Sequence, residues 1–329
     1  MPDTQITTTT RPLSAKDLEP VIAIDKAASG ISRRGYYEKR LAAATDNPRD
    51  YVFVGVFEGD ELAGFAFARL DKGAFGKKGA TATLDAMGVR PDREVQGIGQ
   101  QLLGEVEVIL RHKGVSTLGS QVDWSHWPLL SFLAHRGFAM GSSVILARST
   151  EAVPYRLEVP DEEAEPLEVD FSSPEGDDPG ALSRDRIPVR AMTDKDLAKV
   201  IAIDRANTGN DRSAYFTRKL EEILQQSGVR VSLVAEEDGF PVGFIMARVD
   251  FGEFGHTSAE AVMDSIGVDP GFQHQGIGDA LMAKLMMSLG ALQVESVRTE
   301  VAWNDTALIG YLDRMGFAPT QRIALSKTL

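Results

Sequence analysis

The chain has 329 residues, a length typical of two ordinary domains rather than one. Hydrophobic residues make up 43% and charged residues 25%, the balance of a soluble globular protein. The formal net charge of −13 disfavours nucleic acid and membranes as partners, and the lack of cysteine excludes disulfides, thiolate metal ligands and a cysteine nucleophile.

Neither a signal peptide nor a membrane span is predicted. Residues 1–10 are polar and rich in threonine, and no later run approaches 18 apolar residues. We therefore expect a cytoplasmic protein, and the absence of cysteine agrees with a reducing compartment.

The predicted elements begin with a helix in each half of the chain. Ser14 and Thr193 each stand three residues before an aspartate and open a run of helically spaced apolar residues, which indicates an N-cap and an amphipathic helix. A second helix is predicted over 36–44 and over 215–224. Hairpin strands are predicted over 51–57 and 62–70 and over 231–235 and 242–249, and further strands end at Val89 and Val268.

These elements recur because the chain contains one module twice. An offset of 179 residues aligns the halves without a gap, and 14 of 31 positions are identical between 11–41 and 190–220. The copies also end together, since Thr150 aligns with Leu329. We therefore predict two domains of one fold, at 1–150 and 187–329.

An acidic linker is predicted between the copies, at 151–186. It holds twelve acidic and three basic residues, which accounts for nine of the thirteen net negative charges. Five prolines are spread through it, so the segment is typical of an extended, self-repelling connector. The acidic surplus therefore hardly favours a cationic acceptor, because it lies mainly in the linker.

A loop with two glycines opens a helix in each copy, at Gly97 and Gly99 and at Gly276 and Gly278. Glycines here let a ligand approach unpaired backbone amides at the positive end of the helix dipole, which favours a phosphate. The dinucleotide fingerprint needs a further Gly or Ala three residues on, where both copies have leucine, and the Gly-Lys-Ser/Thr ending of a P-loop is absent.

The segment Gln273-His274-Gln275-Gly276-Ile277-Gly278 resembles the acyl-coenzyme A loop of the GNAT superfamily of N-acetyltransferases, whose signature is Arg or Gln, two residues, Gly, one residue, then Gly or Ala. The first copy retains Gln96 to Gly99 but has Glu94 at the first position, where a carboxylate is unfavourable beside a pyrophosphate. Upstream, 263–270 resembles the fourth strand of the family; downstream, 301–304 and 315–317 resemble its fifth strand, Asn-initiated helix and terminal Gly-Phe.

This resemblance implies two tandem GNAT-like α/β modules, each a mixed, mainly antiparallel sheet flanked by helices. It implies an acetyl-CoA-dependent N-acetyltransferase in which a primary amine attacks the thioester directly, without a metal, and we expect the C-terminal copy to be the catalyst. The cofactor-binding residues implied in that copy are Ile266, Gly267, Val268, Gln273, His274, Gln275, Gly276, Ile277, Gly278, Asp279 and Asn304. Those implied in the first copy are Val89, Gln96, Gly97, Ile98 and Gly99.

The candidate catalytic residues are Tyr311 and Asp264. The family often has a proton-donating tyrosine four residues before the terminal glycine, whereas Tyr311 precedes Gly316 by five, so a packing role stays open. Asp264 could orient the amine or act as a base through water, or could be structural. The resemblance also places Arg212 and Tyr215, and Arg33 and Tyr36, at the acceptor pocket, where burial is the alternative; Trp124 and Trp303 are expected in the core.

Two other functions remain open from the sequence. The protein could be a non-catalytic acyl-CoA-binding sensor or scaffold, or a transferase for a longer acyl chain. The acceptor could be a small-molecule or a peptide amine. The chain could be a monomer in which one copy mimics the second subunit, or a homodimer.

Overall fold

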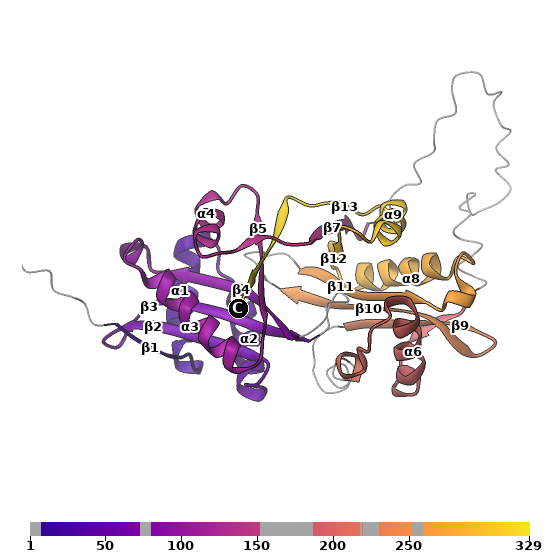
Figure 1. Cartoon of the computed structure of the whole chain (residues 1–329), viewed down its shortest axis with the longest axis horizontal. Helices are drawn as coiled ribbons and strands as arrows, with labels where there is room; N and C mark the ends of the chain where they lie inside the picture. Colours follow the sequence, from indigo (N-terminus) through magenta and orange to yellow (C-terminus); the bar gives the residue numbers. More distant parts are fainter. Residues whose placement is uncertain (1–7, 73–79, 152–186, 218, 220–229, 252–258) are drawn as a thin grey trace, which may run out of the picture.

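The computed structural model describes residues 8–72, 80–151, 187–217, 219, 230–251 and 259–329 (Figure 1). The linker predicted at 151–186 lies outside the described residues apart from its first residue, and so does the end of the helix predicted at 215–224. The described part of the chain forms two seven-stranded sheets that lie side by side.

The elements of the N-terminal half follow the predicted order. They are β1 (Thr8–Pro12), α1 (Leu18–Ser29), α2 (Arg34–Asp46), β2 (Tyr51–Glu58), β3 (Glu61–Lys72), β4 (Ala80–Val89), α3 (Ile98–His112), β5 (Thr117–Asp123), α4 (Trp127–His135), β6 (Ala139–Met140) and β7 (Ser143–Ser149).

The C-terminal half repeats this order. Its elements are β8 (Val189–Ala191), α6 (Leu197–Thr208), β9 (Arg230–Glu237), β10 (Phe240–Phe251), β11 (Ala259–Val268), α8 (Ile277–Ala291), β12 (Ser296–Ala302), α9 (Thr306–Arg314), β13 (Ala318–Pro319) and β14 (Arg322–Thr328). Residues 213–217 are also helical, at the start of the second predicted helix of this half.

Both sheets are mixed and mainly antiparallel. The strand orders are β1-β2-β3-β4-β5-β14-β6 and β13-β7-β12-β11-β10-β9-β8. The pairs β4–β5 and β11–β12 run parallel, whereas the other described pairs are antiparallel. The predicted fold, two α/β modules with helix-flanked sheets, is therefore confirmed.

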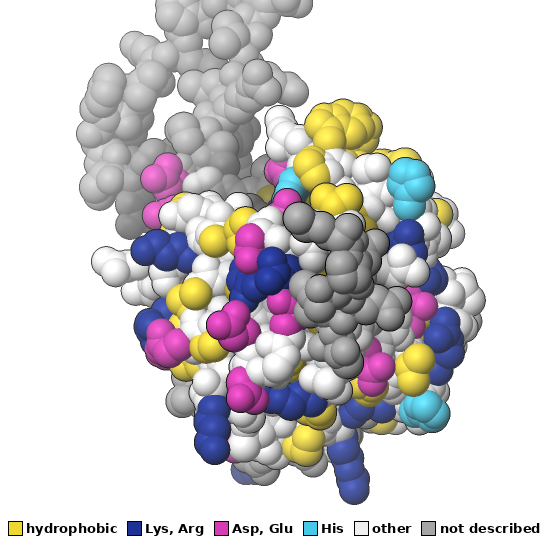
Figure 2. Space-filling view, turned by 90° about the vertical axis from the view of Figure 1, so that its left-hand side faces the viewer, with side chains coloured by type: hydrophobic (Ala, Val, Ile, Leu, Met, Phe, Trp, Pro, Cys, Tyr) yellow, Lys and Arg dark blue, Asp and Glu magenta, His cyan; other side chains and the backbone are white. Residues whose placement is uncertain are grey.

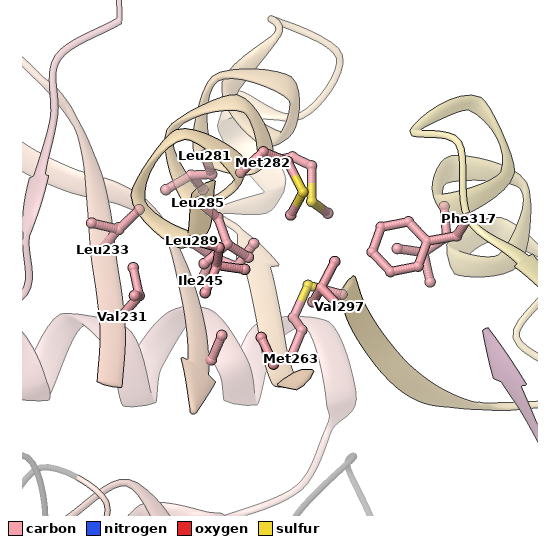
Figure 3. Close-up of a cluster of buried hydrophobic side chains, with 14 of the residues drawn as sticks. Val231, Leu233, Ile245, Met263, Leu281, Met282, Leu285, Leu289, Val297 and Phe317 are labelled. Carbon is pink, nitrogen blue, oxygen red and sulfur yellow. The ribbon is translucent and has the colours of Figure 1, made fainter. Parts of the chain in front are cut away.

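Helices cover both faces of each sheet, as Figure 1 shows for α8 and α6 in the C-terminal half. The apolar side of α8, with Leu281 and Leu285, shares a buried cluster with the strand residues Ile245 and Met263 (Figure 3). On the opposite face, α6 contributes Val200 to a second cluster with β10. Each sheet is thus fixed between two apolar layers, and its loops and strand ends are left for binding.

The predicted N-caps form capping boxes at the start of both first helices. In the first, the backbone amide and the hydroxyl of Ser14 both donate to the Asp17 carboxylate at 2.8 Å, and Thr193 and Asp196 repeat the arrangement. Each aspartate also pairs with an arginine from the preceding strand, Arg11 at 2.8 Å or Arg190 at 2.7 Å. Mainly through these arginine hydrogen bonds, the pKa of each aspartate is lowered to about 2.

This shift predicts an acid-sensitive contribution to stability. Because the folded-state pKa lies below the ordinary value of 3.8, the boxes stabilise the fold fully above that value and lose their effect as the pH falls towards 2. Asp17→Asn and Asp196→Asn should therefore lower the unfolding midpoint at pH 6, and the difference from the wild type should shrink below pH 3. A difference between variant and wild type that is the same at pH 6 and pH 2.5 would contradict this; urea titration at several pH values measures it.

The final strands of the two repeats are exchanged between the sheets. Strand β14, from the end of the chain, pairs with β5 from Arg322↔Asp123 to Thr328↔Thr117. Strand β7 of the first repeat pairs in the same way with β12, from Ser149↔Ser296 to Ser143↔Ala302 (Figure 1). Each repeat therefore completes the sheet of the other, and the boundary between the sheets differs from the boundary between the sequence copies.

Equivalent residues meet where the halves join. Gln121 and Glu300 are 179 positions apart, and the Gln121 amide donates to the Glu300 carboxylate at 3.2 Å. Contact between equivalent residues marks a local two-fold axis. Beside them, the buried Arg298 binds Glu260 at 2.7 Å and the Gln121 side-chain oxygen at 3.3 Å, so a polar network crosses the axis.

Membrane-spanning helices and metal-binding clusters were looked for among the described residues. No described helix is long and apolar enough to cross a bilayer. Within the same residues, no cluster of three or more His, Asp or Glu side chains is placed to hold a metal ion. Lys and Arg side chains are interspersed with Asp and Glu over the face in Figure 2.

Candidate functional site

The two parallel strands at the centre of each sheet diverge. Strands β11 and β12 pair only from Glu260↔Ser296 to Val262↔Arg298, after which β11 continues to Val268 with β10 as its described partner. Strands β4 and β5 likewise pair over Thr81–Thr83 and then separate. The backbone of 263–268 therefore has an edge open towards β12, along which an extended ligand can form strand-like hydrogen bonds.

A β-bulge lies where this open edge begins. Met246 pairs with Ser265 and Ala247 with Met263, so Asp264 is the extra residue; in the first sheet Asp85 is the extra residue between Leu84 and Ala86. Bulges re-aim side chains and are common beside active sites. The sequence places both aspartates at equivalent positions, but only the strand register shows that they occupy the bulges.

Asp264 is buried, with 5% of its surface exposed. Its Oδ2 lies 3.3 Å from the Lys219 ammonium, whereas Oδ1 has no hydrogen-bond partner among the described residues. Burial, followed by the charge of Asp264, raises the pKa of the neighbouring Tyr215 well above its ordinary value. A buried carboxylate oxygen without a partner is costly, and it is suited to accept a hydrogen bond from a ligand.

The first copy treats the equivalent aspartate differently. Asp85 is also buried, and its carboxylate binds the Arg69 guanidinium at 3.1 Å. The sequence gives no local signal for the contact between Lys219 and Asp264, because the two residues lie far apart in the chain. The repeat offers one signal: Lys219 aligns with Arg40, so both copies have a basic residue at this position.

The glycine loops follow one backbone path in both copies. Gly276 has φ 78° and Gly97 φ 87°, and each is the N-cap of the following helix. Two residues earlier, His274 has φ 62° and Val95 φ 64°. These left-handed positions turn the chain into the first turns of α8 and α3. The first amides of any α-helix have no acceptor within the helix, so the start of each helix can bind an anion.

Tyr311 lies against the cofactor loop. Its hydroxyl donates to the Gly278 carbonyl at 2.8 Å, and burial, followed by the charge of Asp279, raises its pKa above the ordinary value. In the first copy Phe132 packs at the same place, near Gly99. The contact holds α9 against α8 and favours the packing role left open in the sequence; the proton-donor role stays a prediction.

The predicted acceptor residues are mostly enclosed. Arg212 is buried and its Nε donates to Asp204 at 3.0 Å, while Arg33 makes the same contact with Asp25. Tyr215 and Tyr36 are 2% and 4% exposed. The guanidinium groups hold the first two helices of each half together, and this burial counts against direct contact with an acceptor.

Two other expectations need correction. The predicted core placement of Trp124 and Trp303 is wrong: they are 55% and 56% exposed, because each follows the last residue of a strand and projects beyond the sheet. The expected Asn-initiated helix is capped one residue later: Asn304 is an exposed turn residue, and the carboxylate of Asp305, the N-cap of α9, accepts from the Leu308 amide at 3.1 Å. The predicted cofactor role of Asn304 stays a prediction.

Comparison with known proteins identifies the family and the fold. The family model "Acetyltransferase (GNAT) family" matches the chain twice, at residues 21–138 and 198–317. A tandem GNAT protein from the clavulanic acid biosynthesis pathway, in a structure without AcCoA, is similar over 98% of both chains, with 18% identity and a TM-score of 0.65.

Two further structures share the fold. A GCN5-related N-acetyltransferase from Sphaerobacter thermophilus is 18% identical over 98% of this chain and 95% of that one, with a TM-score of 0.58. Another, from Kribbella flavida, is 15% identical over 98% of this chain and 71% of that one, with a TM-score of 0.56. With two matches that together cover more than half of its length, the chain belongs to the acetyltransferase (GNAT) family and is an acyltransferase.

Proposed function

We propose that the protein is an acetyl-CoA-dependent N-acetyltransferase whose C-terminal copy transfers the acetyl group to a primary amine of a small molecule or peptide. One observation carries the proposal: the open edge of β11 is followed, after the short 3-10 helix Pro270–Phe272, by the glycine loop at the start of α8. Together these features suit a ligand with an extended amide-containing arm and a diphosphate, which is the chemistry of coenzyme A.

The residues proposed to hold coenzyme A divide by chemistry. The backbone of Ile266, Gly267 and Val268 would pair with the pantetheine arm. The loop from Gln273 to Gly278, with the first turn of α8 at Asp279, would surround the pyrophosphate, and the exposed Asn304 would border the arm from the β12 side. The equivalent segments of the first copy, Val89 and Gln96 to Gly99, would form a weaker site because Glu94 brings a carboxylate to the loop.

Asp264 is proposed to receive the acceptor amine. Its Oδ1, which has no hydrogen-bond partner within the described part of the chain, would accept a hydrogen bond from the amine, directly or through water, and would remove the proton lost as the nitrogen attacks the thioester carbon. The C–N bond forms as the C–S bond breaks, and the departing thiolate takes up a proton. Direct attack fits a chain without cysteine.

An assay that follows the release of free thiol tests the proposal. Acetyl-CoA is first titrated into the protein by calorimetry, and thiol release is then followed with a panel of small amines and peptide N-termini. Turnover with at least one amine is expected. Binding of acetyl-CoA without thiol release for any acceptor would favour a non-catalytic sensor. That function is supported by the Tyr311 hydroxyl, which is already hydrogen-bonded to the Gly278 carbonyl. Faster turnover with a longer acyl-CoA would identify the protein as a transferase for that acyl group.

Substituting Asp264 tests its role separately. Asp264→Asn keeps the shape of the side chain but removes the base, so kcat should fall by about 100-fold while the affinity for acetyl-CoA stays within two-fold. Asp85→Asn, the matched change in the first copy, should leave kcat within two-fold. Thermal melting would show that both variants fold, and a folded Asp264→Asn enzyme with wild-type kcat would overturn the assignment.

The remaining expectations are part of the same proposal. We infer that the chain works in the cytoplasm as a monomer in which the exchanged strands replace a subunit interface. The exchange supports a monomer because both sheets are completed within one chain. Sedimentation at several concentrations would detect a homodimer.

A further inference from the structure

A single asparagine bridges the open strand edge and the glycine loop of the C-terminal copy. Asn207, in the last turn of α6, donates from Nδ2 to the Val268 carbonyl at 2.9 Å. Its Oδ1 accepts a hydrogen bond from Nε2 of the Gln273 side chain at 3.1 Å. The strand that ends at Val268 and the loop that starts at Gln273 are therefore both attached to one side chain.

The chemistry of these groups sets the direction of both hydrogen bonds. A backbone carbonyl only accepts, so Asn207 must turn its NH₂ towards Val268 and its oxygen towards Gln273. Gln273 must in turn present its NH₂ to that oxygen. One N–H of the Gln273 side-chain NH₂ is thereby used, and the other can donate to a ligand. Asn207, which is bound to the end of the strand, fixes the orientation of the Gln273 side chain.

A second contact attaches the same helix to the same strand end. The Lys199 ammonium, in the first turn of α6, lies 2.6 Å from the carboxylate of Asp269, the residue after β11. This ion pair lowers the pKa of Asp269, chiefly through the hydrogen bond from Lys199. Helix α6 is thus fixed to the loop entrance at both of its ends.

The first copy lacks the residues for both contacts. Ala28 and Pro20 stand where the second copy has Asn207 and Lys199, and neither has a polar side-chain group. Glu94 replaces Gln273 and has no N–H to offer, while Arg90 replaces Asp269 and binds Glu61 at 2.9 Å instead. In the first copy, both partners of each contact are therefore replaced together.

We propose that Asn207 is a positioning residue that holds the loop from Gln273 to Gly278 in register with the open edge of β11. The role rests on the proposed function. A ligand with a pantetheine arm and a diphosphate must contact the edge and the loop at once, so fixing their separation in advance lowers the cost of ordering the loop on binding. Asn207 thereby makes the C-terminal copy the tighter cofactor site without contacting the reacting atoms.

Kinetics of Asn207 variants test this role. Asn207→Ala removes both bonds, and Asn207→Asp keeps the acceptor for Gln273 but cannot donate to Val268. In both variants the Kd of coenzyme A by calorimetry and the KM for acetyl-CoA should rise about five- to ten-fold. The kcat and the KM for the amine should stay within two-fold. Asn210→Ala is the matched control, because Asn210 lies just beyond the same helix and its backbone amide donates to Thr208.

A double-mutant cycle adds a readout that a purely structural role would not move. If Asn207 acts through Gln273, then Asn207→Ala with Gln273→Ala should raise the Kd no more than the larger single change. Independent, additive losses would overturn the relay. So would a wild-type Kd in Asn207→Ala, or a loss spread equally over kcat and both KM values. A wild-type protein that binds no coenzyme A would overturn the proposed function itself, before any variant is measured.

Discussion

Replacing Gly276 by aspartate is expected to abolish binding of acetyl-CoA to the C-terminal copy. Gly276 has φ 78°, a left-handed conformation that aspartate adopts less readily than glycine. The new carboxylate would also face the pyrophosphate, where like charges about 4 Å apart repel by roughly 4 kcal/mol at an effective dielectric constant near 20. The affinity measured by calorimetry should fall by more than about 100-fold, and turnover should be lost with it.

Two further variants separate the causes. Asparagine has nearly the same size as aspartate and a similar tolerance of a left-handed backbone, so the two variants differ mainly in charge. If charge repulsion dominates, Gly276→Asn should retain much more affinity for acetyl-CoA than Gly276→Asp. Gly97→Asp makes the same change in the first copy, where Glu94 already brings a carboxylate, and should reduce turnover much less. Equal losses from Gly276→Asp and Gly97→Asp would refute the asymmetry between the copies.

Truncating one leucine of each exchanged strand is expected to destabilise the opposite half of the chain. Leu325, on β14, is buried in the core of the N-terminal sheet, and Leu146, on β7, is buried in the core of the C-terminal sheet. The two occupy equivalent positions in the repeat. Each Leu→Ala change should lower the free energy of unfolding by about 2–4 kcal/mol, because it removes buried apolar surface and leaves a cavity.

Hydrogen exchange locates these effects. Leu325→Ala should speed amide exchange in β5, its pairing partner, more than in β12, and Leu146→Ala should do the reverse. The two variants are controls for each other, since the chemistry and the position in the repeat are the same. Faster exchange confined to the half that contains the substitution in sequence would show that the strands are not exchanged in solution.

The sequence predicted the positions of the two copies and of their glycine loops, because the signals for both are local. Capping residues, strand alternation and the spacing of Gly276 and Gly278 act over a few residues, so they can be recognised without knowing what packs on them. The repeat reinforced each signal by showing it twice. Trp124 and Trp303 show the limit of this reasoning, since an aromatic residue at a strand end can face the core or the solvent.

Tertiary structure alone decided which strand completes which sheet and which aspartate oxygen has no hydrogen-bond partner among the residues that the structure describes. Strands β7 and β14 are equivalent, so each satisfies the pairing rules of either sheet, and the choice depends on contacts between residues far apart in the chain. The bulge at Asp264 arises from strand register, and the bridge from Asn207 to Gln273 joins residues 66 positions apart. The amino-acid sequence by itself determined the module, its duplication and its glycine loop. Long-range packing determined how the halves interlock and how the candidate site is held.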